Sequence, residues 1–291
     1  MSDAVEANGL TFECLRAGDG DRLALCLHGF PDDAESMRPL LERLADEGYT
    51  AVAPYMRGYG PTGPAPDDDY RAATLGTDAI ELADALGFEE AYLVGHDWGA
   101  VAAYAAAHQA PDRFERMATM AVPPGFAEEL WNHPRQFLRS WYIWLFQFPG
   151  VAERTLRAND FALVEVLWSL WSPGWDYPAD RLQAVKDSLR PEGNVEAALA
   201  YYRQFVNPAF KEVVREGPPD GLTEGTIETP GLVVAGGEDG CIGADLFEPA
   251  GDAFAEGVDR RVVTVPDAGH FMHQERPKTV GDEVVEFFDR E

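Results

Sequence analysis

The stretch from Tyr92 to Gly99 is an apolar run that ends in the pattern Gly-x-Asp-x-Gly, in which the aspartate is Asp97. An alanine-rich segment, 100–107, follows, so the pattern predicts a strand, a sharp turn and a helix. A carboxylate presented on such a turn can attack an sp³ carbon and become an alkyl ester itself. A capping role at the start of the helix is the alternative for Asp97.

Three further segments place polar residues just beyond apolar strands. Residues 22–31 run into His-Gly-Phe-Pro, residues 232–239 end in Asp239, and residues 261–270 end in His270. In an open parallel α/β sheet, functional sites lie outside the carboxyl ends of the strands. We therefore expect these groups to meet the aspartate of the turn at one edge of a sheet, in the chain order nucleophile, acid, histidine.

The sequence resembles the epoxide hydrolase family of the α/β-hydrolase superfamily. Gly-x-Asp-x-Gly is the nucleophile elbow of that superfamily, Gly-x-Ser-x-Gly, with aspartate in the serine position. The family pattern of His-Gly-x-Pro, Gly-His-Asp-Trp-Gly, a strand-end aspartate and a late Gly-His stands here at 28–31, 95–99, Asp239 and 269–270. The resemblance covers nearly the whole chain. It implies an α/β-hydrolase fold with a helical cap, and hydrolysis of epoxides to vicinal diols without a cofactor or metal.

The resemblance makes Asp97 the nucleophile and gives it the assistance of Asp239 and His270. Because a carboxylate is already ionised at neutral pH, His270 is not needed to activate Asp97 and is expected to activate the water that cleaves the ester. Asp239 would orient the imidazole and stabilise its cation. Glu238 competes with Asp239 for this role. His273 competes with His270, although we expect His273 to be a surface or capping residue.

The backbone N–H groups of Phe30 and Trp98 are expected to form an oxyanion hole for the intermediate that precedes ester cleavage. Phe30 stands in the His-Gly-x-Pro loop, and Trp98 directly follows the nucleophile. His28 is expected to hold the loop by hydrogen bonds rather than to transfer protons.

The family opens the epoxide ring with two tyrosines of the cap, which protonate or hydrogen-bond the ring oxygen. One precedes a Phe-Gln-x-Pro-Gly segment, and Tyr142 occupies the matching place before 146–150. The other belongs to a Tyr-Arg pair, and the Tyr-Tyr-Arg at 201–203 points to Tyr202. Tyr201 is the alternative if the register differs by one. Each tyrosine alone is commonly a packing residue, but both at the family spacing favour ring opening.

Haloalkane dehalogenases share the aspartate, the histidine and the Trp98 position, and they are the alternative function. They bind the departing halide with this tryptophan and a second donor, which in many of them is an asparagine where this chain has Phe30. Other haloalkane dehalogenases use a tryptophan of the cap as the second donor. The cap tryptophans of this chain therefore keep the dehalogenase hypothesis open. A catalytically silent binding protein of the same fold is a third hypothesis.

Alternating strands and helices predict a mostly parallel, doubly wound sheet. The expected elements of the first part lie at 10–16, 22–28, 37–47, 50–53, 74–86 and 116–122. The alternation then stops near Pro123 and resumes near Pro230. We therefore expect an α/β core at 1–124 and 226–291, interrupted by a helical cap at 125–225.

The predicted cap holds six of the seven tryptophans of the chain. An ordinary helical core explains most of this clustering, because large aromatic side chains dominate buried contacts. We expect Phe146, Phe148, Trp168 and Trp171 to pack the cap rather than to contact a ligand.

The chain carries 51 acidic residues against 23 lysines and arginines, a net charge of −28. This charge opposes binding to nucleic acid or anionic membrane, so a small molecule and water are the expected partners. The acid-rich, lysine-poor composition resembles that of proteins from halophiles, in which salt screens carboxylate repulsion. The three cysteines form neither a disulfide framework nor a zinc pattern, and no signal or membrane-spanning segment is evident. We therefore expect a cytoplasmic protein.

Overall fold

The computed structural model describes residues 2–127, 130, 133–216 and 226–290. Its centre is an eight-stranded sheet in the order β1-β2-β4-β3-β5-β6-β7-β8. The pairs β1–β2 and β2–β4 are antiparallel, and all neighbouring pairs from β4 to β8 are parallel. The strands are β1 (Ser2–Ala7), β2 (Leu10–Ala17), β3 (Arg22–Leu27), β4 (Tyr49–Pro54), β5 (Ala91–His96), β6 (Phe114–Met120), β7 (Gly231–Gly236) and β8 (Arg260–Val265). The predicted mostly parallel α/β sheet is confirmed.

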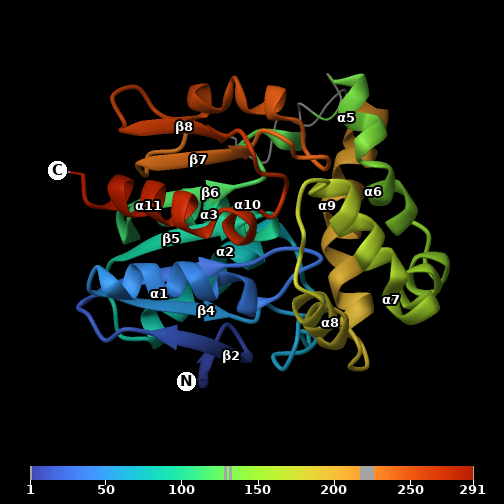
Figure 1. Cartoon of the computed structure of the whole chain (residues 1–291), viewed down its shortest axis with the longest axis horizontal. Helices are drawn as coiled ribbons and strands as arrows, with labels where there is room; N and C mark the ends of the chain where they lie inside the picture. The colour runs from blue at the N-terminus through green and yellow to red at the C-terminus, as the bar shows by residue number, and fades with distance from the viewer. Residues whose placement is uncertain (1, 128–129, 131–132, 217–225, 291) are drawn as a thin grey trace.

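The central strands β4, β5 and β7 are mostly apolar, as expected for parallel strands covered by helices on both faces. Every residue of β4, β5 and β7 is buried. Helices α1 and α11 pack on one face of the sheet, and α2 and α3 pack on the other (Figure 1). The bounds of these helices and of the short helix α10 are as follows: α1 (Arg38–Asp46), α2 (Ala72–Ala85), α3 (Trp98–Gln109), α10 (Met272–Glu275) and α11 (Pro277–Phe288). Short 3₁₀ helices lie at η1 (Ala34–Met37), η2 (Pro111–Arg113), η3 (Ala244–Phe247) and η4 (Ala250–Ala253).

The predicted elements begin at residue 10 and omit β1 (Ser2–Ala7), so the prediction is wrong for this segment. β1 forms a hairpin with β2 in which Ala7 pairs with Leu10. The two turn residues, Asn8 and Gly9, have φ angles of 43° and 74°. Positive φ at both positions suits the right-handed twist of a tight hairpin, and Asn-Gly adopts it readily. This dipeptide is the sequence signal that could have revealed β1.

A helical region is inserted between β6 and β7 and lies at one end of the sheet (Figure 1). Its helices are α5 (Pro134–Arg139), α6 (Trp141–Phe146), α7 (Val151–Trp171), α8 (Ala179–Ser188) and α9 (Asn194–Glu216). α7 is interrupted at residues 158–161, where the backbone angles are not helical. The predicted limits of the cap, residues 125 and 225, stay predictions. Residue 225 and Trp131 lie outside the described residues.

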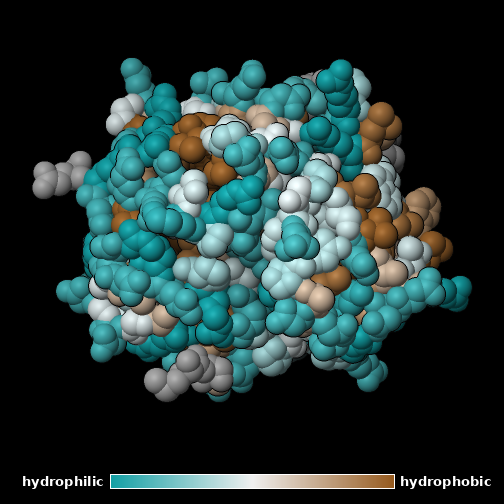
Figure 2. Space-filling model, in the orientation of Figure 1, coloured by the Kyte–Doolittle hydropathy of each residue, from teal (hydrophilic) through white to brown (hydrophobic). Residues whose placement is uncertain are grey.

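Three of the aromatic residues expected to pack the cap, Phe146, Trp168 and Trp171, are buried. The expectation is wrong for Phe148, which is 61% exposed because it lies in the turn between α6 and α7. Exposed apolar side chains gather over the inserted helices (Figure 2). They are Phe137, Leu138, Trp141, Phe148, Val151, Val166 and Leu170. Among the described residues, no helix combines the length and apolarity needed to cross a membrane.

The excess of carboxylates predicts a stability that depends on salt. Arginines are shared between acids, as Arg43 is between Glu47 and Asp282, yet 51 acids face only 23 lysines and arginines. Molar KCl shortens the Debye length to about 3 Å and screens this repulsion. We expect the thermal midpoint to rise by several degrees between dilute buffer and molar KCl, since each kcal/mol is worth about 2–4 °C in a domain of 150–250 residues. A midpoint that is independent of KCl would contradict the halophilic interpretation.

Candidate active site

Asp97 joins β5 to α3 in a strained turn, with φ of 52° and ψ of −115°. The turn is possible because Gly99 has no side chain: a Cβ there would lie 2.0 Å from the Leu27 carbonyl oxygen. The Asp97 carbonyl accepts hydrogen bonds from Ala100 N and Val101 N, but its side chain does not cap the helix. The side-chain capping role considered for Asp97 is therefore not what the structure contains.

The carboxylate of Asp97 is buried, and one of its oxygens is held by the backbone. Phe30 N donates a hydrogen bond to Asp97 Oδ1 at 2.7 Å. The loop can approach this closely because Gly29 lacks a side chain, and a Cβ there would lie 2.4 Å from the same oxygen. The Trp98 amide, the other expected donor, makes no hydrogen bond to this carboxylate within the described residues. Oδ2 is therefore the oxygen left for chemistry.

His270 stands between Asp97 and Asp239. Its Nδ1 lies 2.9 Å from Asp239 Oδ2, and its Nε2 lies 3.7 Å from Asp97 Oδ2. Asp239 Oδ1 accepts two backbone hydrogen bonds from the following turn, at 2.6 and 3.0 Å. Both oxygens of this buried carboxylate are thus engaged, which fixes the imidazole that it contacts. Glu238, the competing acid, is exposed.

The charges around His270 hold a proton on its ring. Burial by itself lowers the pKa of the imidazole, but the charge and hydrogen bond of Asp239, followed by those of Asp97, raise it to about 10. In the free protein at neutral pH the ring is therefore an imidazolium between two carboxylates. Because part of the rise comes from Asp97, neutralising that carboxylate lowers the pKa of His270 again.

An apolar pocket opens beside Asp97, with a volume of about 720 Å³ that includes its mouth toward solvent. Tyr142 of α6 and Tyr202 of α9 line it, so the inserted helices and the core both contribute to its wall. Most of the other lining side chains are apolar, for example Val101 and Phe126. Asp97 is the charged side chain among the described residues of this wall.

The two tyrosine hydroxyls have different surroundings. Tyr142 Oη lies 3.3 Å from Cys241 Sγ. Tyr202 Oη has no hydrogen-bond partner among the described groups, and its ring meets the Trp98 ring edge-on at a centroid distance of 5.1 Å. Burial raises the pKa of both phenols well above their usual range, and the charge of Asp97 acts in the same direction. Both hydroxyls therefore stay protonated and can act as donors.

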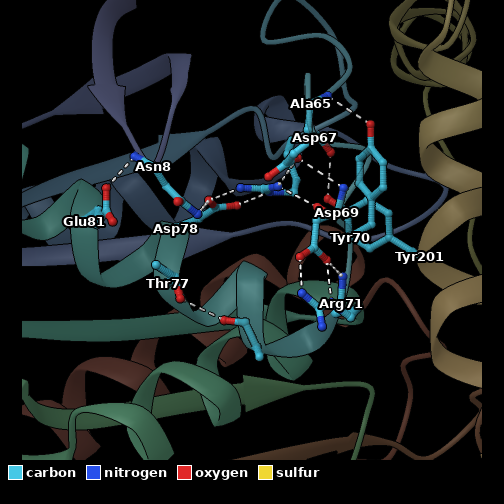
Figure 3. A network of polar contacts seen from close by, with 12 residues as sticks. Asn8, Ala65, Asp67, Asp69, Tyr70, Arg71, Thr77, Asp78, Glu81 and Tyr201 are labelled. Atoms are coloured by element: carbon cyan, nitrogen blue, oxygen red, sulfur yellow. Dashed lines mark hydrogen bonds and ion pairs between the residues drawn. The ribbon is translucent and has the colours of Figure 1, made fainter. Parts of the chain in front are cut away.

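The structure distinguishes Tyr202 from Tyr201, the alternative in the same helix. Tyr201 Oη donates to the Arg57 carbonyl oxygen at 2.7 Å and does not line the pocket. The buried Arg57 guanidinium in turn donates two hydrogen bonds of 2.5 Å to Asp78 in α2. Figure 3 shows Tyr201 beside this network, which anchors α9 to the core. Tyr201 is thus held at the core, whereas Tyr202 faces the pocket.

Two other histidines near the site, His28 and His273, lie in surroundings that suit a structural role. His28 holds its loop as predicted, because Nδ1 donates to Gly29 O and Nε2 accepts from Met56 N, both at 3.0 Å. The expectation that His273 is a surface or capping residue is wrong. It is fully buried in α10, with Nε2 3.7 Å from Asp32 Oδ2, and burial lowers its pKa to about 3. The local sequence of a short helix does not reveal what packs on it.

Comparison with known proteins assigns the family. A family model described as the alpha/beta hydrolase fold matches residues 25–277. Epoxide hydrolase A of Mycobacterium tuberculosis is 30% identical over 312 residues, which span 97% of this chain and 95% of that protein. The chain belongs to the epoxide hydrolase-like family of α/β-hydrolases. The resemblance stated from the sequence motifs is thereby confirmed at the level of the family.

Solved structures of epoxide hydrolases have the same fold. Epoxide hydrolase A from Mycobacterium thermoresistibile has a TM-score of 0.81 at 28% identity, covering 99% of this chain and 97% of that one. A single-residue mutant of an epoxide hydrolase from Bacillus megaterium, crystallised with its naphthyloxy-propanediol product, has a TM-score of 0.86 at 24% identity, covering 99% of this chain and 100% of that one. These likenesses confirm the α/β-hydrolase fold with an inserted helical region.

Sequence reasoning missed Cys241 as a neighbour of the site in this member of the family. The thiol is fully buried, and one atom each of Asp239, Cys241 and His270 lie within 4.8 Å of one another. Burial and the Asp239 charge raise the pKa of the thiol well above its usual range, so it stays protonated. Through its contact with Tyr142, Cys241 connects the Asp239–His270 pair to the pocket wall. Its position two residues after Asp239 is the signal that could have found it.

Proposed function

We propose that the protein hydrolyses epoxides to vicinal diols through an alkyl ester on Asp97. The observation that carries the proposal is that Tyr142 and Tyr202 line one apolar pocket with this carboxylate. A carboxylate is a modest nucleophile, so it needs a strained electrophile or a good leaving group. Two protonated phenols suit the strained ring, because its oxygen leaves as an alkoxide that needs a donor.

In the first step, Asp97 Oδ2 attacks a ring carbon and the ring carbon–oxygen bond breaks. The departing oxygen receives a proton or hydrogen bonds from Tyr142 and Tyr202. Phe30 N, 2.7 Å from Oδ1, orients the carboxylate for this attack, and such alignment supplies much of the rate. The apolar wall, with Asp97 as its charged group among the described residues, favours uncharged apolar epoxides as substrates.

In the second step, water attacks the carbonyl carbon of the Asp97 ester while His270 takes its proton. The bond between this carbon and Oδ2 then breaks, the departing oxygen takes up the proton from His270, and the diol leaves a carboxylate at Asp97. Alkylation neutralises Asp97 and removes part of what raises the pKa of His270, so the ring can become a base. Oδ1 gains negative charge in the tetrahedral intermediate, and the Phe30 N–H stabilises it there. The Trp98 N–H is the second donor of this oxyanion hole in the proposal. Asp239 keeps the imidazole oriented throughout.

Haloalkane dehalogenation is the second candidate, and one observation favours it. The indole N–H of Trp98, a residue of the pocket wall, partly offsets the rise that burial causes in the pKa of the Tyr202 phenol that it faces but makes no full hydrogen bond among the described groups, so it can donate to a halide. The asparagine that many dehalogenases use as second donor is replaced by Phe30, whose ring packs against Phe146 and Tyr202. A halide leaves without protonation and needs at most one donor beside Trp98, whereas an alkoxide needs a proton. The pocket therefore supports ring opening better.

Parallel assays on epoxides and bromoalkanes test the proposal. We expect diol from styrene oxide and alkyl epoxides, and no comparable bromide release. A single turnover in ¹⁸O-water should leave the label out of the first diol and in Asp97, because water attacks the ester rather than the substrate. Bromide release without diol would favour the dehalogenase, and turnover of neither panel would favour a silent binding protein. Label in the first diol would contradict the ester.

A further inference from the structure

Three metal-ligating side chains meet in the interior, away from the pocket wall. Asp32 follows β3, His96 ends β5 and His273 lies in α10, and all three are fully buried. One oxygen or nitrogen from each lies within 4.8 Å of the other two. The three elements meet because the carboxyl ends of β3, β5 and β8 lie at the same edge of the sheet.

The hydrogen bonds around this cluster leave ring nitrogens without partners. His96 Nε2 lies 2.9 Å from the His270 carbonyl oxygen, so Nε2 carries the proton and Nδ1 presents a lone pair. His96 Nδ1 and both ring nitrogens of His273 have no hydrogen-bond partner among the described groups. Buried polar atoms are rarely left unsatisfied. A histidine that binds a metal commonly donates its other N–H to a backbone carbonyl, as His96 does.

The spacing between His273 and Asp32 fits an ion better than a hydrogen bond or a water. His273 Nε2 lies 3.7 Å from Asp32 Oδ2, which is too long for a direct hydrogen bond. Two hydrogen bonds of about 2.8 Å through a water at a tetrahedral angle span roughly 4.6 Å. Two ligands about 2.0–2.2 Å from a tetrahedral ion stand roughly 3.3–3.6 Å apart. The observed 3.7 Å between His273 Nε2 and Asp32 Oδ2 is close to this separation of two ligands on one ion.

The charges around Asp32 also suit a cation. Arg181 Nη2 contacts Asp32 Oδ1 and Asp33 Oδ1. Two carboxyl groups therefore meet a single guanidinium beside the cluster. Asp32 Oδ2 accepts a hydrogen bond from Gln274 Nε2 at 2.9 Å and keeps a lone pair for a ligand.

We propose that Asp32, His96 and His273 form a buried site for a divalent transition-metal ion. Two imidazoles and one carboxylate favour an ion such as Zn²⁺ over Mg²⁺ or Ca²⁺, which prefer oxygen ligands. The ion would join three strand-end segments and, through the hydrogen bond from His96 to the His270 carbonyl, brace the backbone of the catalytic histidine. None of the three side chains is among the described residues that line the substrate pocket, although the His96 ring packs edge-on against the His270 ring at a centroid distance of 5.0 Å. The proposed role of the site is therefore structural.

Metal retention by the full chain tests this proposal. Protein stripped with a chelator is incubated with excess ZnCl₂ or CoCl₂, desalted and analysed for metal. We expect about one ion per chain, with a visible Co²⁺ spectrum of nitrogen coordination. His273→Gln should weaken binding at least tenfold, and Asp32→Asn should do the same. His108→Gln, which removes an exposed histidine of α3, is the matched control and should bind as the unaltered protein does.

Two results would overturn the proposal. In the first, the unaltered protein retains no more metal than His273→Gln, so the cluster would hold no metal ion. The second is an ion that Cys241→Ser loses and His273→Gln keeps, which would place it at Asp239, Cys241 and His270. Near-ultraviolet circular dichroism of the metal-free variants checks their folding, and if His273→Gln folds poorly the result of Asp32→Asn decides. Zn²⁺ should raise the thermal midpoint of the unaltered protein but not of either site variant.

Discussion

Replacement of His270 by glutamine is expected to stop the protein with substrate covalently attached to Asp97. Ring opening needs the carboxylate and the tyrosine donors, whereas ester hydrolysis needs a base for the attacking water. Turnover should therefore fall by roughly 10²–10⁴-fold, the range for loss of a general base. Mass spectrometry after mixing with an epoxide should show one added substrate mass, and peptide mapping should place it on Asp97.

The matched control is Asp97→Asn in the same His270→Gln background. It lacks the attacking carboxylate and should show no adduct, while Asp97→Asn alone should lose turnover altogether. An unmodified Asp97 peptide from His270→Gln protein saturated with substrate would remove the proposed role of His270.

The pH dependence of ester hydrolysis measures the same role independently. In the free protein, Asp239 and Asp97 raise the pKa of His270 to about 10. The ester lacks the Asp97 charge, so the hydrolysis rate should rise with pH through a lower pKa and then level off. In the free protein, the imidazolium contributes fully to stability below its unfolded pKa of about 6.5, and this contribution is lost as pH rises toward 10. Thermal melts of His270→Gln should lack that decline.

The sequence was sufficient to bring Asp97, Asp239 and His270 to one place, because each follows an apolar strand. Parallel strands end at the same edge of a sheet, so residues far apart in the chain meet there without any knowledge of side-chain packing. Apolar runs and the amphipathic period of the helices also indicated the order of the core elements. This reasoning omits a strand that is not an apolar run, such as β1, for which the Asn8–Gly9 turn was the stronger indication.

The surroundings of residues that contact distant elements of the fold could not be predicted in the same way. Tyr201 and Tyr202 are neighbours of the same type, yet Tyr201 bonds the Arg57 carbonyl whereas Tyr202 lines the pocket. The burial of His273 depends on Asp32 and His96, which come from two other strand ends. Neither contact leaves a periodic or local pattern in the sequence, so only the three-dimensional structure reveals them.

Replacement of Tyr142 and Tyr202 together by phenylalanine is expected nearly to abolish ring opening. An alkoxide is a poor leaving group, so the reaction depends on donors placed at the ring oxygen. Each single change should slow alkylation by roughly 10- to 10⁴-fold, since it removes one protonated hydroxyl from the pocket while keeping the ring. Rapid-quench measurement of the Asp97 ester reports this step directly.

Tyr201→Phe is the matched control, because it removes a neighbouring buried hydroxyl that binds Arg57 O and not the pocket. It should leave alkylation close to the parent rate even if it lowers stability, and hydrolysis of a preformed ester should be little changed in all these variants. That second half-reaction depends on His270 and the Phe30 amide, neither of which the substitutions touch. A double variant that opens epoxides at the parent rate would show that the hydroxyls only pack the cap. In that case the leaving oxygen would need another donor, and the Trp98 indole N–H is the remaining candidate in the pocket wall.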